Sequence, residues 1–369
     1  MNPTLVPTTF DALPGWRHDA IAAALPAFLA SCEKIAALPP HAPVAPAAYG
    51  ALAGTAGDWH DACAAARRVP PNDEASARGF VAEWFAPYQL RATETETGLF
   101  TGYYEAELAA SRVATPHFNV KIFAPPPGAG LVQTAGAVPL PTRADIETTD
   151  AAKNWPVLLW TNSSVDLFMA QVQGSARVRL TDGTVTRINY AANNGYDFVA
   201  IGRLMLERNI IPQSQASAQG IRAWLKANPD PAAKLMRENP RYIFFRENTG
   251  PGPIGAHGTV LTPGRSLAVD PAFVPLGALV WLDTVHPGTI DAPLRRLMVA
   301  QDTGNAIKGV VRGDVYFGSG EPALADAGRM KQAGRYFVLL PRKKAALQKA
   351  ADDASVAALV ARPGNPARR

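Results

Sequence analysis

Apolar residues recur three and four positions apart along the first ninety residues of the chain, which is the spacing of helices that bury one face. The pattern covers 19–38, 51–69 and 76–90, so we expect an N-terminal helical segment. Beyond it the period changes to two. Residues 94–111, ETETGLFTGYYEAELAAS, alternate as a strand with one buried face, and Gly102 is expected to break that strand.

The rest of the chain mixes short strand patterns with short helical ones. Strand patterns occupy 117–124, 155–162 and 176–192, and the Asp-Gly pair in the last predicts a hairpin with a primed turn. Short helices are expected over 166–174, 197–209, 217–229 and 231–240. Strands return from 241 to 342. Because turns separate most strands, the pattern favours one or two closed barrels over a βαβ sheet.

Composition narrows the class of protein only slightly. The 369 residues, 47% of them hydrophobic, suit two globular domains. The sequence holds no apolar run of eighteen residues that would span a membrane. Residues 1–20 lack the basic start and apolar core of a signal peptide. A cytoplasmic protein, and an exported one whose leader is not in this sequence, both stay open.

Charge and cysteine content leave further alternatives. The net charge is +5, with Lys and Arg scattered, which suits an anionic polymer such as nucleic acid or an acidic cell-wall glycan. Zinc-finger spacing, a Walker loop and GxGxxG do not occur in the sequence. Cys32 and Cys63 lie in the helical segment. They are either buried thiols of a reducing compartment or a disulfide of an exported protein.

Three aspartates close apolar segments of the C-terminal third. Asp270 ends RSLAVD, Asp302 ends RLMVAQD, and Asp314 lies in GDVYFG. If these segments are strands of one barrel, the three carboxyls could meet at its mouth. A carboxyl that apolar surroundings keep protonated is the general acid that cleaves glycosidic bonds, and Asp314 fits that type. The alternative is that each aspartate caps a turn.

Two other functions compete with glycoside cleavage. Asp302 belongs to an Asp-Thr-Gly triplet, the signature of aspartic proteases, but such a site needs two triplets and this chain has one. A protease would therefore have to be a dimer. A noncatalytic barrel that binds glycans is the other alternative, because the aromatic residues of GYY and WTNSS are platforms on which sugars can stack.

An ordered set of motifs resembles the membrane-bound lytic murein transglycosylase A family, over roughly 85–340. The motifs are GLFTGYYEAEL, LPTRADIE, LLWTNSSVDLFMAQVQGSARVRLTDG, NNGYDFVAIGRLM, NPRYIFFRE and RLMVAQDTGNAIKGVVRGDVYFGSG. The resemblance implies a mainly β protein with N-terminal helices, built from a double-psi β-barrel and an inserted second β-barrel with a groove between them. The expected domains are 1–107 plus 241–345, the insert 108–240, and a tail 346–369.

By resemblance the protein is a lytic exotransglycosylase, which cleaves the β-1,4 bond between N-acetylmuramic acid and N-acetylglucosamine without water and leaves 1,6-anhydromuramic ends. Asp314 matches the single catalytic aspartate, and Asp302 the acid that assists it. The matching substrate-binding residues are Asp270, Thr101, Tyr103, Tyr104, Asp166, Gln171, Gln173 and Ser175. Lys308 and Arg312 are candidates to bind the lactyl carboxylate, or else solvated loop charges. Glu105 and Glu107 replace a proline-bearing turn of the family and are expected to alter one subsite.

The resemblance also implies partners and a location. The expected partner is the glycan strand of peptidoglycan, with cell-wall enzyme complexes as a further possibility and no nucleic acid. We expect a monomer without cofactor or metal, in the periplasm or at the outer membrane of the cell envelope.

Overall fold

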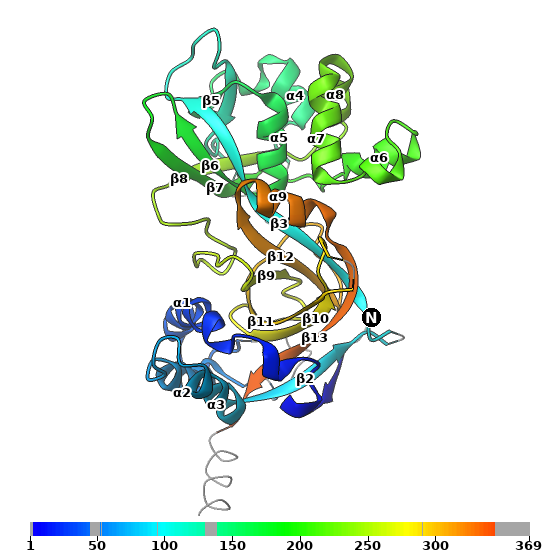
Figure 1. The fold of residues 1–369 in the computed structure, drawn as a ribbon. Helices are drawn as coiled ribbons and strands as arrows, with labels where there is room; N and C mark the ends of the chain where they lie inside the picture. Colours follow the sequence, from blue (N-terminus) through cyan, green and yellow to red (C-terminus); the bar gives the residue numbers. More distant parts are fainter. Residues whose placement is uncertain are drawn as a thin grey trace, which may run out of the picture.

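The computed structural model describes residues 3–44, 52, 54–93, 95–129, 139–289 and 291–343. The predicted tail at 346–369 lies outside these residues. Within them the fold is mixed α/β rather than mainly β (Figure 1). The long strand β3 (Gly98–Ser111) runs through the molecule and belongs to the sheets of both its parts.

The N-terminal segment forms helices as predicted, but only as far as Trp84. They are α1 (Leu25–Ala36), α2 (Ala56–Ala66) and α3 (Glu74–Trp84). A disulfide between Cys32 and Cys63 joins α1 to α2, so the two cysteines are paired rather than free thiols. The helix expected over 76–90 was wrong beyond Trp84, because β2 (Phe85–Arg91) pairs with β1 (Thr4–Pro7) on one side and β13 (Lys331–Pro341) on the other.

Six strands pair in a closed circuit that forms the lower part of the sheet. In order they are β13, β10 (Leu279–Val285), β11 (Pro293–Asp302), β9 (Ser266–Val269), β12 (Arg312–Ser319) and β3, which pairs with β13 again. The side chains within and around this circuit make one core with the N-terminal helices, including Trp281, Phe100, Phe85 and Trp59. The circuit therefore fixes the strands that carry Asp302 and Asp314, and β9, which Asp270 follows.

Strand β3 does not break at Gly102. A Cβ at this position would lie 2.6 Å from the ring of Phe317 and 2.9 Å from Cα of Ala327. The glycine lets the ring of Phe317 pack directly on the strand, and the strand continues for 14 residues. The predicted interruption was wrong because the pattern identifies a glycine but not the side chain that fills its space.

The upper part of β3 enters a second sheet. The other strands are β4 (Val120–Phe123), β5 (Val157–Thr161), β6 (Ser175–Leu180), β7 (Val185–Asn193) and β8 (Ile243–Asn248), in the order β4-β5-β3-β6-β7-β8. The hairpin between β6 and β7 is confirmed, but its turn is not a primed one. Gly183 alone has a left-handed conformation, and its N–H donates to the carbonyl of Leu180, which is the pattern of a type I turn followed by a glycine bulge.

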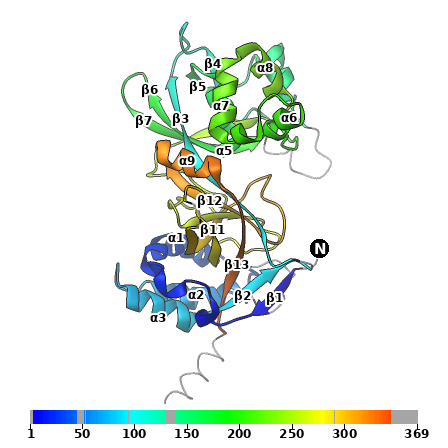
Figure 2. The ribbon, with the colours of Figure 1, turned by 45° about the vertical axis from the view of Figure 1, so that its right-hand side comes forward.

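Helices cover the second sheet and the junction of the two parts. They are α4 (Arg143–Thr148), α5 (Ser164–Gln173), α6 (Ile201–Glu207), α7 (Ala218–Ala227), α8 (Pro229–Arg237) and α9 (Gly320–Arg329). The sequence predicted helices where α5 to α8 lie. It missed α4 and α9. Helix α9 packs on β3 and β12 and contacts α7 (Figure 2). Among the described residues, no helix has the length and apolar character needed to cross a membrane.

Candidate active site

Strand register brings two of the predicted aspartates to one row of side chains. Ala268 on β9 is the register partner of Asp302 on β11 and of Asp314 on β12. Thr101 on β3 is the partner of Asp314 on the other side. Because partners in register lie on the same face of a sheet, the row reads Asp302, Ala268, Asp314, Thr101. Two strand spacings put the backbones of the two acids roughly 10 Å apart.

Asp314 is a half-buried carboxyl with a raised pKa. Burial, together with the nearby Asp302, raises its pKa to about 6, although Thr101 and Arg312 favour the charged form. The hydroxyl of Thr101 donates to Oδ1 of Asp314 at 2.6 Å. The guanidinium of Arg312 donates in turn to Thr101 Oγ1 at 2.8 Å. With this pKa, about half of Asp314 is protonated at pH 6 and about a tenth at pH 7, so a protonated fraction is available to act as a general acid.

Asp302 lies in the same groove but is held by more donors. It accepts hydrogen bonds at 2.9 Å from the hydroxyl of Tyr103 and from the backbone N–H groups of Ala256 and Thr303. Burial raises its pKa, and these three bonds oppose the rise. Burial beside Asp302 also raises the pKa of Tyr103 far above its usual value, so this hydroxyl stays a donor. The donors orient Asp302 and leave it little freedom to deliver a proton.

The third aspartate does not line the groove. Asp270 follows β9 and is 5% exposed. Its carboxylate accepts from the backbone N–H groups of Ala272 and Gly309, at 3.1 and 2.9 Å. Lys308 lies 4.0 Å away. Asp270 thus fixes the loop between Asp302 and Asp314, which is the turn-holding role that the sequence left as an alternative.

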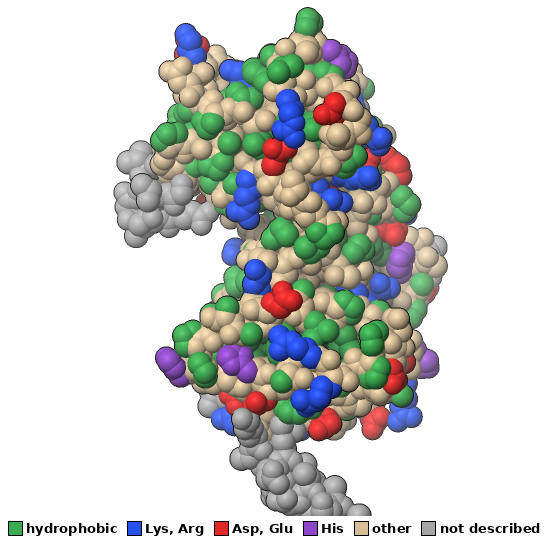
Figure 3. Space-filling model, turned by 90° about the vertical axis from the view of Figure 1, so that its left-hand side faces the viewer, with side chains coloured by type: hydrophobic (Ala, Val, Ile, Leu, Met, Phe, Trp, Pro, Cys, Tyr) green, Lys and Arg blue, Asp and Glu red, His purple; other side chains and the backbone are tan. Residues whose placement is uncertain are grey.

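A groove of about 830 Å³ runs between the two parts of the molecule and contains Asp302 and Asp314. Figure 3 shows the surface hollowed between the upper and lower parts. Thr101 and Tyr103 line the groove from β3, and Gln171, Gln173 and Ser175 line it from α5 and β6. The structure therefore brings together seven of the ten predicted site residues.

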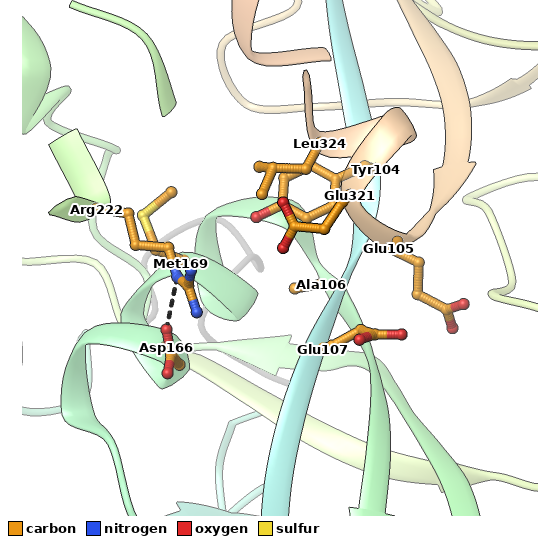
Figure 4. Close-up of a pocket in the computed structure, with 10 residues that line it drawn as sticks. Tyr104, Glu105, Ala106, Glu107, Asp166, Met169, Arg222, Glu321 and Leu324 are labelled. Atoms are coloured by element: carbon orange, nitrogen blue, oxygen red, sulfur yellow. Dashed lines mark hydrogen bonds and ion pairs between the residues drawn. The ribbon is translucent and has the colours of Figure 1, made fainter. Parts of the chain in front are cut away.

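Tyr104 and Asp166 are not among these seven. They line a separate cavity of about 100 Å³ between β3, α5 and α9, next to Glu321 and Leu324 (Figure 4). Asp166 binds Arg222 at 2.7 Å and Lys226 at 2.9 Å, and these charges help to lower its pKa against the effect of burial. Tyr104 reaches the groove only through its backbone N–H, which donates to Gln173 Oε1 at 3.1 Å.

Sequence reasoning missed one residue that shapes the site, Ala268, and expected a different role for another, Arg312. Ala268 lies between the two acids, and its methyl group leaves the space above β9 open to a ligand. Arg312 was considered for the lactyl carboxylate, but it donates to Thr101 and to the carbonyl of Leu99. Each role depends on the register of strands distant in the sequence, so no local pattern indicates it.

Known proteins resemble this chain in fold and in sequence. The model of the MltA specific insert domain matches residues 99–246, and that of the 3D domain matches residues 265–340. A solved structure of the lytic transglycosylase LtgG of Burkholderia pseudomallei is 40% identical with a TM-score of 0.62, over 92% of this chain and 96% of that one. The membrane-bound lytic murein transglycosylase from Agrobacterium tumefaciens is 32% identical with a TM-score of 0.79, over 92% and 98%.

A curated relative agrees with these structures. Membrane-bound lytic murein transglycosylase A of Escherichia coli (strain K12) is 30% identical over 246 residues. The match spans 65% of this chain and 65% of that protein. The class defined by fold and sequence is thus that of the lytic transglycosylases with an insert and a 3D domain. The chain belongs to the membrane-bound lytic murein transglycosylase A family, as its ordered motifs predicted.

Proposed function

We propose that the protein is a peptidoglycan lytic transglycosylase in which Asp314 acts first as acid and then as base. The observation that carries this is a single half-buried carboxyl with a pKa of about 6, which lines a groove large enough for a glycan strand. Protonated Asp314 donates to the oxygen of the β-1,4 bond between N-acetylmuramic acid and N-acetylglucosamine as this bond breaks.

The second half of the reaction needs no protein nucleophile. The carboxylate of Asp314 removes the proton from the C6 hydroxyl of the muramic acid, and O6 attacks C1 of the same sugar. One C–O bond breaks, one forms, and Asp314 ends protonated as it began. Intramolecular attack has a high effective molarity, so a groove that holds the ring and excludes water favours it over hydrolysis.

Asp302 fits a supporting role in this scheme. Its charge raises the pKa of Asp314, and the donors around it hold its carboxylate in place. Thr101, Tyr103, Gln171, Gln173 and Ser175 are the proposed glycan contacts, since all five line the groove.

The finer architecture belongs to the same proposal. We assign the closed circuit of strands as a double-psi β-barrel, within a domain of 1–107 plus 241–345, and the insert 108–240 as a second β-barrel. The closed pairing from β13 round to β3 supports the first assignment. The names of the relatives support a location in the cell envelope, in the periplasm or at the outer membrane, and a glycan strand as partner.

The test is incubation with purified murein sacculi, followed by mass analysis of the released muropeptides. We expect 1,6-anhydro ends from the native protein, and none from Asp314→Asn, which is nearly isosteric but cannot donate and retrieve the proton. Reducing ends heavier by one water would instead show a hydrolase. Binding without release of products would show a glycan-binding protein, and pepstatin-sensitive cleavage of peptides would show a protease.

A further inference from the structure

The groove is positively charged. Two carboxylates line it, Asp302 and Asp314, and burial raises the pKa of both. Five basic side chains line the same groove, from both parts of the molecule: Arg143, Arg241, Arg246, Lys308 and Arg312. A neutral glycan would not need this excess of positive charge, so the chemistry of the groove favours a ligand that carries carboxylates.

Three of these cations have structural partners. Arg143 is buried and donates to the carbonyls of Asn239 and Arg241. Arg241 donates to the carbonyl of Tyr196 at 2.7 Å. Arg312 holds Thr101, as described above. The hydrogen-bond donors of these three arginines therefore already bind groups of the protein.

Arg246 is different, because its guanidinium makes no hydrogen bond or ion pair with any residue that the structure describes. It is exposed on β8, opposite Asn189 of β7. Cross-strand partners share a face. The amide of Asn189 donates to the carbonyl of Ile254, a residue of the groove wall, so the face that carries Arg246 is turned toward that wall. Lys308, the remaining cation, forms a long ion pair with Asp270 at 4.0 Å.

We propose that Arg246 binds a carboxylate carried by the muramic acid of the glycan, and that it thereby determines specificity for murein over neutral β-1,4 glycans. A guanidinium matches the two oxygens of a carboxylate and binds them through charge-assisted hydrogen bonds. The carboxylate belongs either to a peptide stem or, where the stem has been removed, to the lactyl group. This assignment rests on the proposed function, since it concerns the substrate of the same groove.

The experiment measures binding apart from turnover. In an Asp314→Asn background, dissociation constants are measured by calorimetry for three soluble glycans: stem-bearing murein fragments, the same fragments stripped by an amidase, and chitohexaose, which has no carboxylate. Arg246→Gln should weaken binding of at least one murein ligand by about tenfold or more and leave chitohexaose unchanged. The ligand that responds identifies the stem or the lactyl group as the source of the carboxylate.

The matched control is Arg179→Gln, which removes an exposed arginine of β6, a strand that β7 separates from β8 and whose Arg179 does not line the groove. It should leave all three constants unchanged, and Arg246→Lys should restore part of the loss. An equal loss for chitohexaose, or no loss for either murein ligand, would overturn the assignment. Native protein that releases no anhydro product overturns the proposed function instead, while the binding comparison still decides the role of Arg246.

Discussion

At the scale of single residues, the hydroxyl of Thr101 controls the proton of Asp314. Its hydrogen bond favours the carboxylate and so lowers the pKa of Asp314, against the larger effect of burial. If protonated Asp314 is the acid, kcat/KM falls as pH rises through about 6. Thr101→Val removes the bond, raises the pKa, and should move this alkaline limb upward by about one pH unit. The measurement is the pH profile of anhydromuropeptide release.

Thr284→Val is the matched control. Thr284 also lies in the closed circuit and donates to the carbonyl of Ala333, but it does not line the groove. Its loss should reduce stability without moving the pH profile. A Thr101→Val profile that overlays that of the native protein would argue that Asp314 is not the titrating acid.

Ionised Asp314 should also lower the free energy of unfolding of the protein. Its folded pKa of about 6 lies above the usual value of 3.8, so the folded state binds its proton more tightly. Stability is therefore lost as pH rises from about 4 through about 6. Asp314→Asn should stabilise the protein by up to about 3 kcal/mol at pH 8, and by roughly a third of that at pH 4.5. Urea unfolding at the two pH values measures the gain.

The exposed Asp230 of α8 provides the comparison, because Asp230→Asn should change stability by less than about 0.5 kcal/mol at either pH. An Asp314→Asn variant less stable than the native protein at pH 8 would contradict the raised pKa.

The role of a residue could be predicted from the sequence where it depends on that side chain alone. It could not be predicted where it depends on a contact with a residue distant in the sequence. The apolar setting of Asp314 is visible in GDVYFG. Its contact with Thr101 is not, because 213 positions separate the two and only the pairing of β12 with β3 joins them. The same holds for Asp166, whose motif suggested the groove but whose ion pairs with Arg222 and Lys226 hold it in another cavity.

At the scale of elements, long periodic segments were predicted better than segments defined by pairing. Helices α1, α2 and α3 show a clear 3.6-residue pattern and were found. The residues of β2 continued that pattern, but hydrogen bonding to β1 and β13 made them a strand. The helix α9 was missed because the glycines at 318 and 320 resemble the turns between strands. Both have positive φ, but Gly318 lies in β12, where the register with β3 shifts, and Gly320 is the first residue of α9.

The disulfide between α1 and α2 predicts a stability effect at this scale. It closes a loop with a sequence separation of 31 and joins two buried side chains. Replacing both residues, Cys32→Ala with Cys63→Ala, should lower the free energy of unfolding by about 3–4 kcal/mol, because the unfolded chain gains freedom. Urea unfolding with and without a reducing agent measures this, and the variant should not respond to the reductant. Native protein with two titratable thiols and an unchanged midpoint would contradict the expected stabilisation.

At the scale of the whole molecule, β3 is the strand through which the two parts share a backbone. Its pairing with β12 extends to Glu105, and its pairing with β6 begins at Ala106. At this point Glu105, 2% exposed, binds Arg187 of β7 at 2.9 Å. Arg187 also donates to the carbonyl of Gly250, at the start of the loop whose Ala256 binds Asp302. One ion pair thus connects the second sheet, the shared strand and the loop beside the site.

The ion pair of Glu105 and Arg187 should therefore contribute more to the free energy of unfolding than the exposed ion pairs of the same sheet. Arg187→Met would leave the carboxylate of Glu105 buried without its partner and should cost about 3–5 kcal/mol in urea unfolding, whereas Glu105→Gln with Arg187→Met should recover much of that loss. Arg112→Met breaks the exposed pair with Glu247 of the same sheet and should cost less than about 1 kcal/mol. Equal costs for Arg187→Met and Arg112→Met would show that the junction depends on β3 alone. A double variant no more stable than Arg187→Met would place the cost in the lost bond to Gly250 rather than in the buried charge.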